Sequence, residues 1–175
     1  MLREPLDPEK YRLRRQRVAG LLADRRIGAL IVGPGSDLAY LAGYRIPTSE
    51  RMTALVLTAD GGAVLVVPVL EARRAKAAAP GLELRQWQEA DDPSVLAAAA
   101  AAGSGDVAVG DELWAMFVLT LQNALPARRF RPASEVIRVL RMRKEAGELL
   151  ALREGCLLGG SRVRAHPRAR VRRPP

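Results

Sequence analysis

Apolar residues in this chain fall into two kinds of pattern. Short runs of mostly apolar residues are typical of strands in a sheet, and runs spaced three or four residues apart are typical of helices that bury one face. The strands predicted in this way are 29–32, 53–58, 63–67, 82–87, 106–110 and 130–133. The predicted helices are 8–26, 38–41, 70–79, 95–102, 113–125 and 135–154.

Local signals mark where several of these elements begin and end. Asp7-Pro8 and Asp92-Pro93 each place a capping carboxylate before a proline, which is a favourable start for a helix. Either Ser36 or Asp37 is a candidate cap for the short helix 38–41, which Gly43 would close. Gly28 is expected to end the first helix, and Gly147 makes a bend in the last helix plausible.

The order of the elements indicates the fold class. Segments 53–58 and 63–67 are joined by Ala59-Asp60-Gly61-Gly62, which predicts a β-hairpin. After the hairpin, strands alternate with helices, as in proteins that cover a sheet with helices on its faces. We therefore predict an α/β fold with a layered, mixed β-sheet flanked by helices.

The composition of the chain limits the number of domains and the cellular compartment. The chain has 175 residues, 49% of them hydrophobic, which suits one domain or one domain and the start of another. The lone cysteine, Cys156, fits a reducing compartment, and neither a secretory signal nor an apolar segment of membrane-spanning length is visible. We expect a cytoplasmic protein that does not enter a membrane.

The net charge of +9 raises the alternative of a polyanion or nucleic-acid binder. Six arginines and no acid lie between residues 161 and 175, so much of the positive charge belongs to the end of the chain. The rest of the chain is nearly balanced in charge and has few aromatic residues for stacking on bases. We therefore do not expect nucleic acid as a partner, and the alternative of polyanion binding depends on the arginine-rich end.

The residue types in this chain give little support to a hydrolytic active site. The only histidine is His166, so Ser36 and Ser49 lack a base within the body of the chain. The pairs Asp91-Asp92 and Asp111-Glu112 are neighbours in sequence, and helix capping or solvation explains them better than acid–base catalysis. We expect no catalytic residue, no metal ligand and no cofactor-binding residue in this chain, although a metallopeptidase active as it stands remains open.

The segment from Tyr40 to Arg51 is a candidate binding loop. It carries Arg45 and Arg51, and a guanidinium on such a loop can hold a carboxylate through two parallel hydrogen bonds. Tyr44, Arg45 and Arg51 are therefore the candidate substrate-contacting residues. The alternative is that Tyr44 anchors the core while both arginines are solvated.

The order of these motifs resembles the N-terminal domain of the creatinase, prolidase and aminopeptidase P family of Xaa-Pro peptidases. Residues 28–32, then Tyr40-Leu41-Ala42-Gly43-Tyr44, then the hairpin follow the family order, and residues 139–144 are similar to its linker helix. The resemblance covers roughly residues 9–155. It implies a creatinase/prolidase N-terminal fold with a ribonuclease H-like motif.

The resemblance also implies what surrounds such a domain. In full-length relatives a "pita-bread" catalytic domain holds two divalent metals (manganese, cobalt or zinc), and the N-terminal domain of dimeric relatives reaches over the partner's active site. Here we expect a domain at 1–134, a linker helix at 135–155 towards an absent catalytic domain, and a disordered, possibly frameshifted basic tail at 156–175. The expected function is a non-catalytic domain that associates with itself or with intact relatives and shapes a substrate site.

Overall fold

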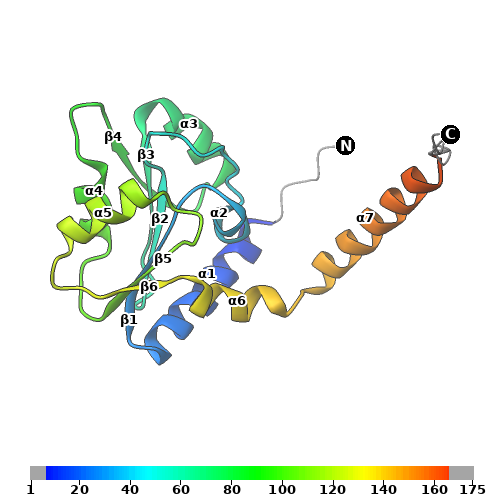
Figure 1. The fold of residues 1–175 in the computed structure, drawn as a ribbon, viewed down its shortest axis with the longest axis horizontal. Helices are drawn as coiled ribbons and strands as arrows, with labels where there is room; N and C mark the ends of the chain where they lie inside the picture. The colour runs from blue at the N-terminus through cyan, green and yellow to red at the C-terminus, as the bar shows by residue number, and fades with distance from the viewer. Residues whose placement is uncertain (1–6, 166–175) are drawn as a thin grey trace, which may run out of the picture. The chain divides into compact units, whose positions relative to one another are not determined.

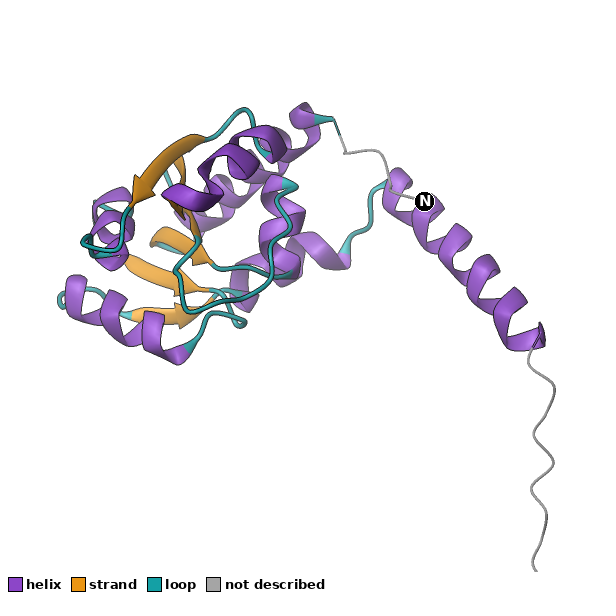
Figure 2. Cartoon of the chain, turned by 90° about the horizontal axis from the view of Figure 1, so that it is seen from above, coloured by secondary structure: helices purple, strands orange, loops and turns teal. Residues whose placement is uncertain are grey.

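The computed structural model describes residues 7–165, which form a six-stranded sheet with helices on both faces (Figures 1 and 2). The chain divides into two compact units, Met1–Leu140 and Arg141–Pro175. The strands are β1 (Ile27–Val32), β2 (Ala54–Thr58), β3 (Ala63–Pro68), β4 (Glu83–Trp87), β5 (Asp106–Val109) and β6 (Phe130–Pro132). The helices are α1 (Pro8–Asp24), α2 (Ser36–Ala42), α3 (Val69–Ala78), α4 (Pro93–Ala100), α5 (Ala115–Ala124), α6 (Ser134–Met142) and α7 (Ala146–Ala165).

The predicted mixed sheet is confirmed, with the strand order β4-β3-β2-β1-β5-β6. The β2–β3 hairpin is antiparallel, and β2 is also antiparallel to β1, whereas β1 pairs in parallel with β5. The outer pairs β3–β4 and β5–β6 are parallel as well. Only β2 therefore runs against the other five strands, so the start of β2 and the carboxyl ends of the others meet at one edge.

Each face of the sheet has its own apolar core. Alternate residues of the central strands, such as Leu30 and Leu57, pack with α1, α2, α3 and α6 on one face. The neighbouring residues Ile31 and Val56 point the other way and pack with α4 and α5. Figure 1 shows α4 and α5 on the side of the sheet opposite α1, α2 and α6. We call these the first helix layer (α1, α2, α3 and α6) and the second helix layer (α4 and α5).

Two predicted helix starts are confirmed. A side-chain oxygen of Asp7 accepts a hydrogen bond from the backbone N–H of Glu9 at 3.0 Å, and that of Asp92 accepts one from Ser94 at 2.8 Å. The prediction that Gly28 ends the first helix is wrong, because α1 ends at Asp24 and Gly28 lies within β1. A Cβ on Gly28 would meet the carbonyl oxygen of Ser104 at 1.9 Å, so this glycine allows two backbone segments to approach closely.

The prediction of one helix over 135–154 is wrong. The helical region is interrupted at 143–145, and Gly147 lies inside the first turn of α7 instead of marking the break. The backbone N–H of Glu145 donates to the Glu148 carboxylate at 2.9 Å, while the carbonyl of Glu145 accepts from the N–H of Glu148. The Glu148 side chain thus caps the first turn of the new helix, as the glutamate of a capping box does.

Helix α7 continues to Ala165 and so overlaps the first ten residues of the predicted tail at 156–175. Glycines in this stretch weaken a helix by only about 1 kcal/mol each, and proline, which prevents helical hydrogen bonding, first occurs at Pro167. His166 and the last four of the six arginines lie outside the described residues.

Candidate functional site

The candidate loop, Gly43 to Thr53, connects α2 to β2. It lies at the sheet edge where β2 begins and β1, β3 and β5 end, as the pairing of Val32 with Leu55 and of Ala54 with Val66 shows. In open sheets of this kind, the carboxyl edge is where loops with binding residues gather. The three candidate residues Tyr44, Arg45 and Arg51 all belong to this loop.

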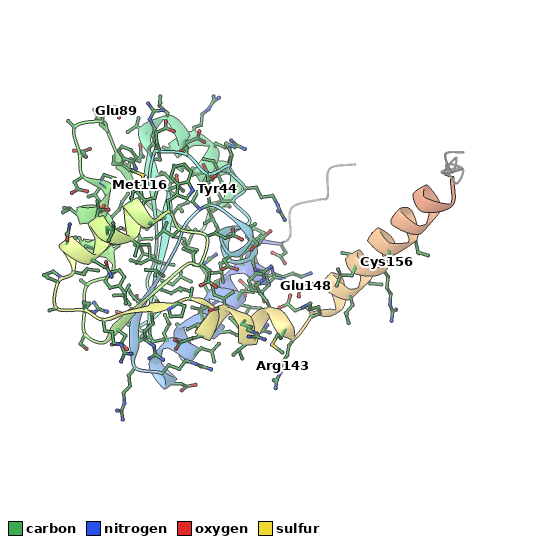
Figure 3. The ribbon with its side chains drawn as sticks, viewed as in Figure 1. Tyr44, Glu89, Met116, Arg143, Glu148 and Cys156 are labelled. Carbon is green, nitrogen blue, oxygen red and sulfur yellow. The ribbon has the colours of Figure 1, made fainter. Side chains whose placement is uncertain are left out.

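Tyr44 anchors the start of the loop. Its side chain is 1% exposed, and its hydroxyl donates to the Glu71 carboxylate on α3 at 3.2 Å (Figure 3). Burial, followed by the charge of Glu71, raises the pKa of the Tyr44 phenol to about 12. Its ring is therefore part of the core beneath the loop, which is the alternative considered from the sequence, and a contact of Tyr44 with substrate stays a prediction.

The end of the loop is held in a similar way. Met52 is fully buried, and its carbonyl accepts a hydrogen bond from the indole N–H of Trp87 at 2.9 Å. A third contact fixes the backbone near the start, where the guanidinium of Arg74 donates to the carbonyl of Arg45 at 3.1 Å. The backbone of the loop is thus fixed on both sides of its exposed middle.

Arg51 is engaged within its own domain. Its Nε donates to the Glu89 carboxylate at 2.8 Å, and 43% of its side chain is exposed. The hydrogen bond to Glu89 raises the pKa of Arg51. Figure 3 places Glu89 on the loop that follows β4. A ligand carboxylate would have to compete with Glu89 for this guanidinium.

Arg45 differs from Arg51. It is exposed, and within residues 7–165 its guanidinium makes no hydrogen bond or ion pair. It lines an open hollow of about 330 Å³ together with Gly35, Ile46 and Pro47. A cation beside small apolar walls suits a small carboxylate that carries an apolar group.

Sequence reasoning missed the part that Glu112 plays beside this loop. The prediction that Ser36 or Asp37 caps α2 is wrong. The cap residue is Gly35, which has a φ of 148°. Instead, the Glu112 carboxylate accepts from the backbone N–H of Ser36 at 3.2 Å and from its hydroxyl at 3.3 Å. A Cβ on Gly35 would lie 1.7 Å from that carboxylate. The contact spans 76 residues, so no local pattern could have revealed it.

A second missed feature is the pair Arg14 and Arg15 on α1. Arg14 is 2% exposed, and its guanidinium lies 4.0 Å from the centre of the Tyr40 ring and 5.9 Å from that of Tyr11. Arg14 donates to the carbonyl of Tyr40 and Arg15 to that of Leu41, each at 3.0 Å. Two cations thus bind the carboxyl end of α2, where they complement the helix dipole just before the candidate loop begins.

In the described part of the chain, no group of three or more His, Cys, Asp or Glu side chains is placed so that it could hold a metal ion. None of the helices between residues 7 and 165 is both long and apolar enough to cross a bilayer.

The sheet order and the two helix layers define a layered α/β domain with a mixed sheet. The Creatinase/Prolidase N-terminal domain family matches residues 14–143. The chain belongs to this family, which confirms the resemblance noted in the sequence.

Similar proteins agree with this assignment. A probable dipeptidase PepE of Mycobacterium tuberculosis is 39% identical over 166 residues, which cover 93% of this chain and 43% of that protein. The crystal structure of dipeptidase PepE from Mycobacterium ulcerans superposes with a TM-score of 0.78 and 38% identity over 84% of this chain and 40% of that one. The N-terminal domain of an X-Pro dipeptidase from Streptococcus pyogenes, at 19% identity, shares the fold with a TM-score of 0.64 over 73% of this chain and 98% of that one.

The chain spans less than half the length of the curated relatives it matches. A match confined to residues 1–154 could not cover 93% of the chain, so the similarity extends beyond Glu154. The comparison therefore gives no support to a change of reading frame at that point.

Proposed function

We propose that this chain acts as the non-catalytic N-terminal domain of a Xaa-Pro dipeptidase-like protein, lining a substrate site that a catalytic domain completes. The observation that carries the proposal is the loop Gly43–Thr53, which its own domain fixes through Tyr44, Met52 and the Arg45 carbonyl while the Arg45 guanidinium is exposed. A rigid loop that presents one uncommitted cation is suited to orienting a ligand carboxylate. The similarity to dipeptidases over under half their length supports the same role.

In this proposal Arg45, and not Arg51, meets the substrate carboxylate. Arg51 already donates to Glu89, whereas Arg45 lines the hollow beside Ile46 and Pro47. The apolar walls would accommodate the ring of a carboxyl-terminal proline. Two divalent metals would belong to the catalytic domain of a full-length relative, and none is assigned to this chain.

The partners proposed are a second copy of the chain or an intact relative, in the cytoplasm. Leu149, Leu150, Leu152 and Leu157 of α7 are between 47% and 75% exposed. Such leucines favour association, since exposed apolar side chains gain free energy when they are covered.

Reconstitution tests the proposal. The catalytic part of the Mycobacterium ulcerans dipeptidase, expressed without its own N-terminal domain, would be mixed with this chain and assayed for cleavage of a Xaa-Pro dipeptide. We expect the chain to form a complex and to raise kcat/KM. Loss of a charge-assisted hydrogen bond of about 1.5–3 kcal/mol predicts that Arg45→Gln removes roughly tenfold or more of that gain.

Arg51→Gln is the matched control and should keep the gain, while Arg45→Lys should keep only part of it because an ammonium cannot form two parallel bonds. Absence of both a complex and a gain would refute the proposed role. A loss with Arg51→Gln but not with Arg45→Gln would transfer the substrate contact to Arg51.

A further inference from the structure

Two hollows adjoin at the carboxyl edge of the sheet. The first is the hollow of about 330 Å³ beside Arg45. The second is narrower, about 10 Å³, and its lining includes Glu112 and Trp114. Gly35 and Pro47 line the first hollow, and their chain neighbours Pro34 and Thr48 line the second, so the two hollows lie on either side of the same backbone. We call them the Arg45 hollow and the Glu112 hollow.

The Glu112 carboxylate is held at the boundary of the two hollows. It accepts hydrogen bonds from the backbone N–H of Ser36 at 3.2 Å and from the Ser36 hydroxyl at 3.3 Å. A Cβ on Gly35, in the wall of the Arg45 hollow, would lie 1.7 Å from this carboxylate. Since a carboxylate has about four lone-pair sites, Glu112 keeps the capacity to accept from a further donor.

The Glu112 hollow has the size and the chemistry of a site for an ammonium group. A volume of about 10 Å³ holds one group of the size of water, which is also the size of a primary ammonium. Such a group donates hydrogen bonds, and an ionised carboxylate is its strongest acceptor in a protein. Trp114, whose ring stacks on Phe117 with centroids 6.1 Å apart, adds an aromatic ring that attracts cations.

Arg51 also lines the Glu112 hollow, and its positive charge opposes a bound cation. This charge is offset by Glu89, which lies 2.8 Å from the Arg51 Nε, and by Glu50, which lies 4.0 Å from the guanidinium. Together with Glu112, three carboxylates stand against one guanidinium. The charge around the Glu112 hollow therefore favours a cation, whereas the Arg45 hollow favours an anion.

We propose that the Glu112 hollow binds the primary ammonium group of a dipeptide whose carboxylate meets Arg45. This inference deepens the proposed function and rests on it for the role of Arg45. Opposite charges in adjoining hollows suit a ligand with an ammonium group at one end and a carboxylate at the other. An N-acetylated dipeptide has no ammonium group to offer, so Glu112 selects for peptides with a free amino end.

NMR titration of the whole, isotope-labelled chain tests the inference, with alanylproline and N-acetylalanylproline as the probes. Two charge-assisted contacts at an exposed site predict a Kd on the order of 1 mM for alanylproline. The acetylated peptide should bind about tenfold more weakly, because it lacks the bond to Glu112. The indole N–H signal of Trp114 should shift with alanylproline, whereas that of Trp87, which donates to the Met52 carbonyl, should stay in place.

Three variants locate the ammonium contact. Glu112→Gln should bind both peptides with similar Kd values, because the amide keeps an acceptor for Ser36 but loses the negative charge. Asp111→Asn is the matched control: it removes the same charge from the neighbouring residue, which lines neither hollow, and should keep the preference for the free peptide. Arg45→Gln should weaken the binding of both peptides to a similar extent and leave the preference in place.

Several outcomes would overturn the inference. These are equal affinities of the wild type for the two peptides, a preference that survives in Glu112→Gln, and a preference that is lost in Asp111→Asn. The absence of a saturable shift with alanylproline up to about 20 mM, far above the expected Kd, would overturn it as well.

These results are independent of the reconstitution described above. A chain that shows the preference but neither binds nor activates the catalytic part keeps the ammonium site and loses the proposed role. A chain that activates the catalytic part but shows no preference loses only the ammonium site.

Discussion

The two helix layers cover the same sheet in opposite ways. The first layer is rich in charged residues, and these anchor the loop Gly43–Thr53 through Glu71 and Arg74 and the end of α2 through Arg14 and Arg15. The second layer has uncharged helices, and several of their exposed side chains, such as Met116 and Leu119, are apolar. The difference shows two ways of covering a sheet: polar contacts in the first layer fix the loop 43–53, whereas the second layer is held mainly by apolar packing.

The largest effect should be the same in both layers, because both depend on apolar packing. Leu22 on α1 and Leu121 on α5 are each fully buried. Leu22→Ala and Leu121→Ala should each lower the free energy of unfolding by about 3 kcal/mol through lost burial and the cavity that remains. Urea denaturation measures the change. A loss in only one of them would mean that the sheet has one core and not two.

A smaller change in the free energy of unfolding should be specific to the first layer. Arg14→Leu removes the hydrogen bond to the Tyr40 carbonyl and the contact with its ring, and should lower the free energy of unfolding by about 2 kcal/mol. The control Arg73→Leu, on an exposed position of α3, should change it by less than about 0.5 kcal/mol. Equal changes in the free energy of unfolding for the two variants would show that Arg14 contributes no more to stability than an exposed arginine does.

The Tyr44 anchor should make stability depend on pH in the alkaline range. The folded pKa of Tyr44, about 12, is above its ordinary value of 10.0, so the folded state holds the proton more tightly. This contribution is complete below about pH 10 and is lost as pH rises through 12, by on the order of 1 kcal/mol. Denaturation of the wild type and Tyr44→Phe between pH 9 and 12 should show the steeper decline in the wild type. Parallel curves would contradict the anchor.

The smallest effect concerns the Arg51–Glu89 pair. The pair is exposed, so Glu89→Gln should leave the denaturation midpoint unchanged. It should, however, increase the fast motion of the Arg51 Nε–H measured by NMR relaxation, and bring it close to that of Arg45. Unchanged motion at Arg51 would remove the reason for assigning the substrate contact to Arg45.

Local sequence patterns identified much of this molecule. The caps at Asp7 and Asp92, the hairpin, all six strands and the mixed sheet followed from short-range signals, and the family resemblance was confirmed. These features depend on residues within a few positions of each other, where spacing and propensity suffice.

The features that escaped prediction depend on contacts between distant segments. Glu112 reaches Ser36 across 76 residues, and Arg14 is buried because Tyr40 lies over it. Arg45 and Arg51 were equivalent in the sequence, and only the position of Glu89 distinguishes them. The break between α6 and α7 is the exception, since Glu145 and Glu148 have capping-box spacing that could have been noticed.

The central proposal is that this chain lines a substrate site and has no hydrolytic activity of its own. Incubation of the purified chain with a Xaa-Pro dipeptide and added manganese or cobalt, followed by chromatography of the released amino acids, tests it most directly. The claim predicts no hydrolysis above the rate with metal alone. Turnover that scales with chain concentration and disappears with a chelator would contradict it.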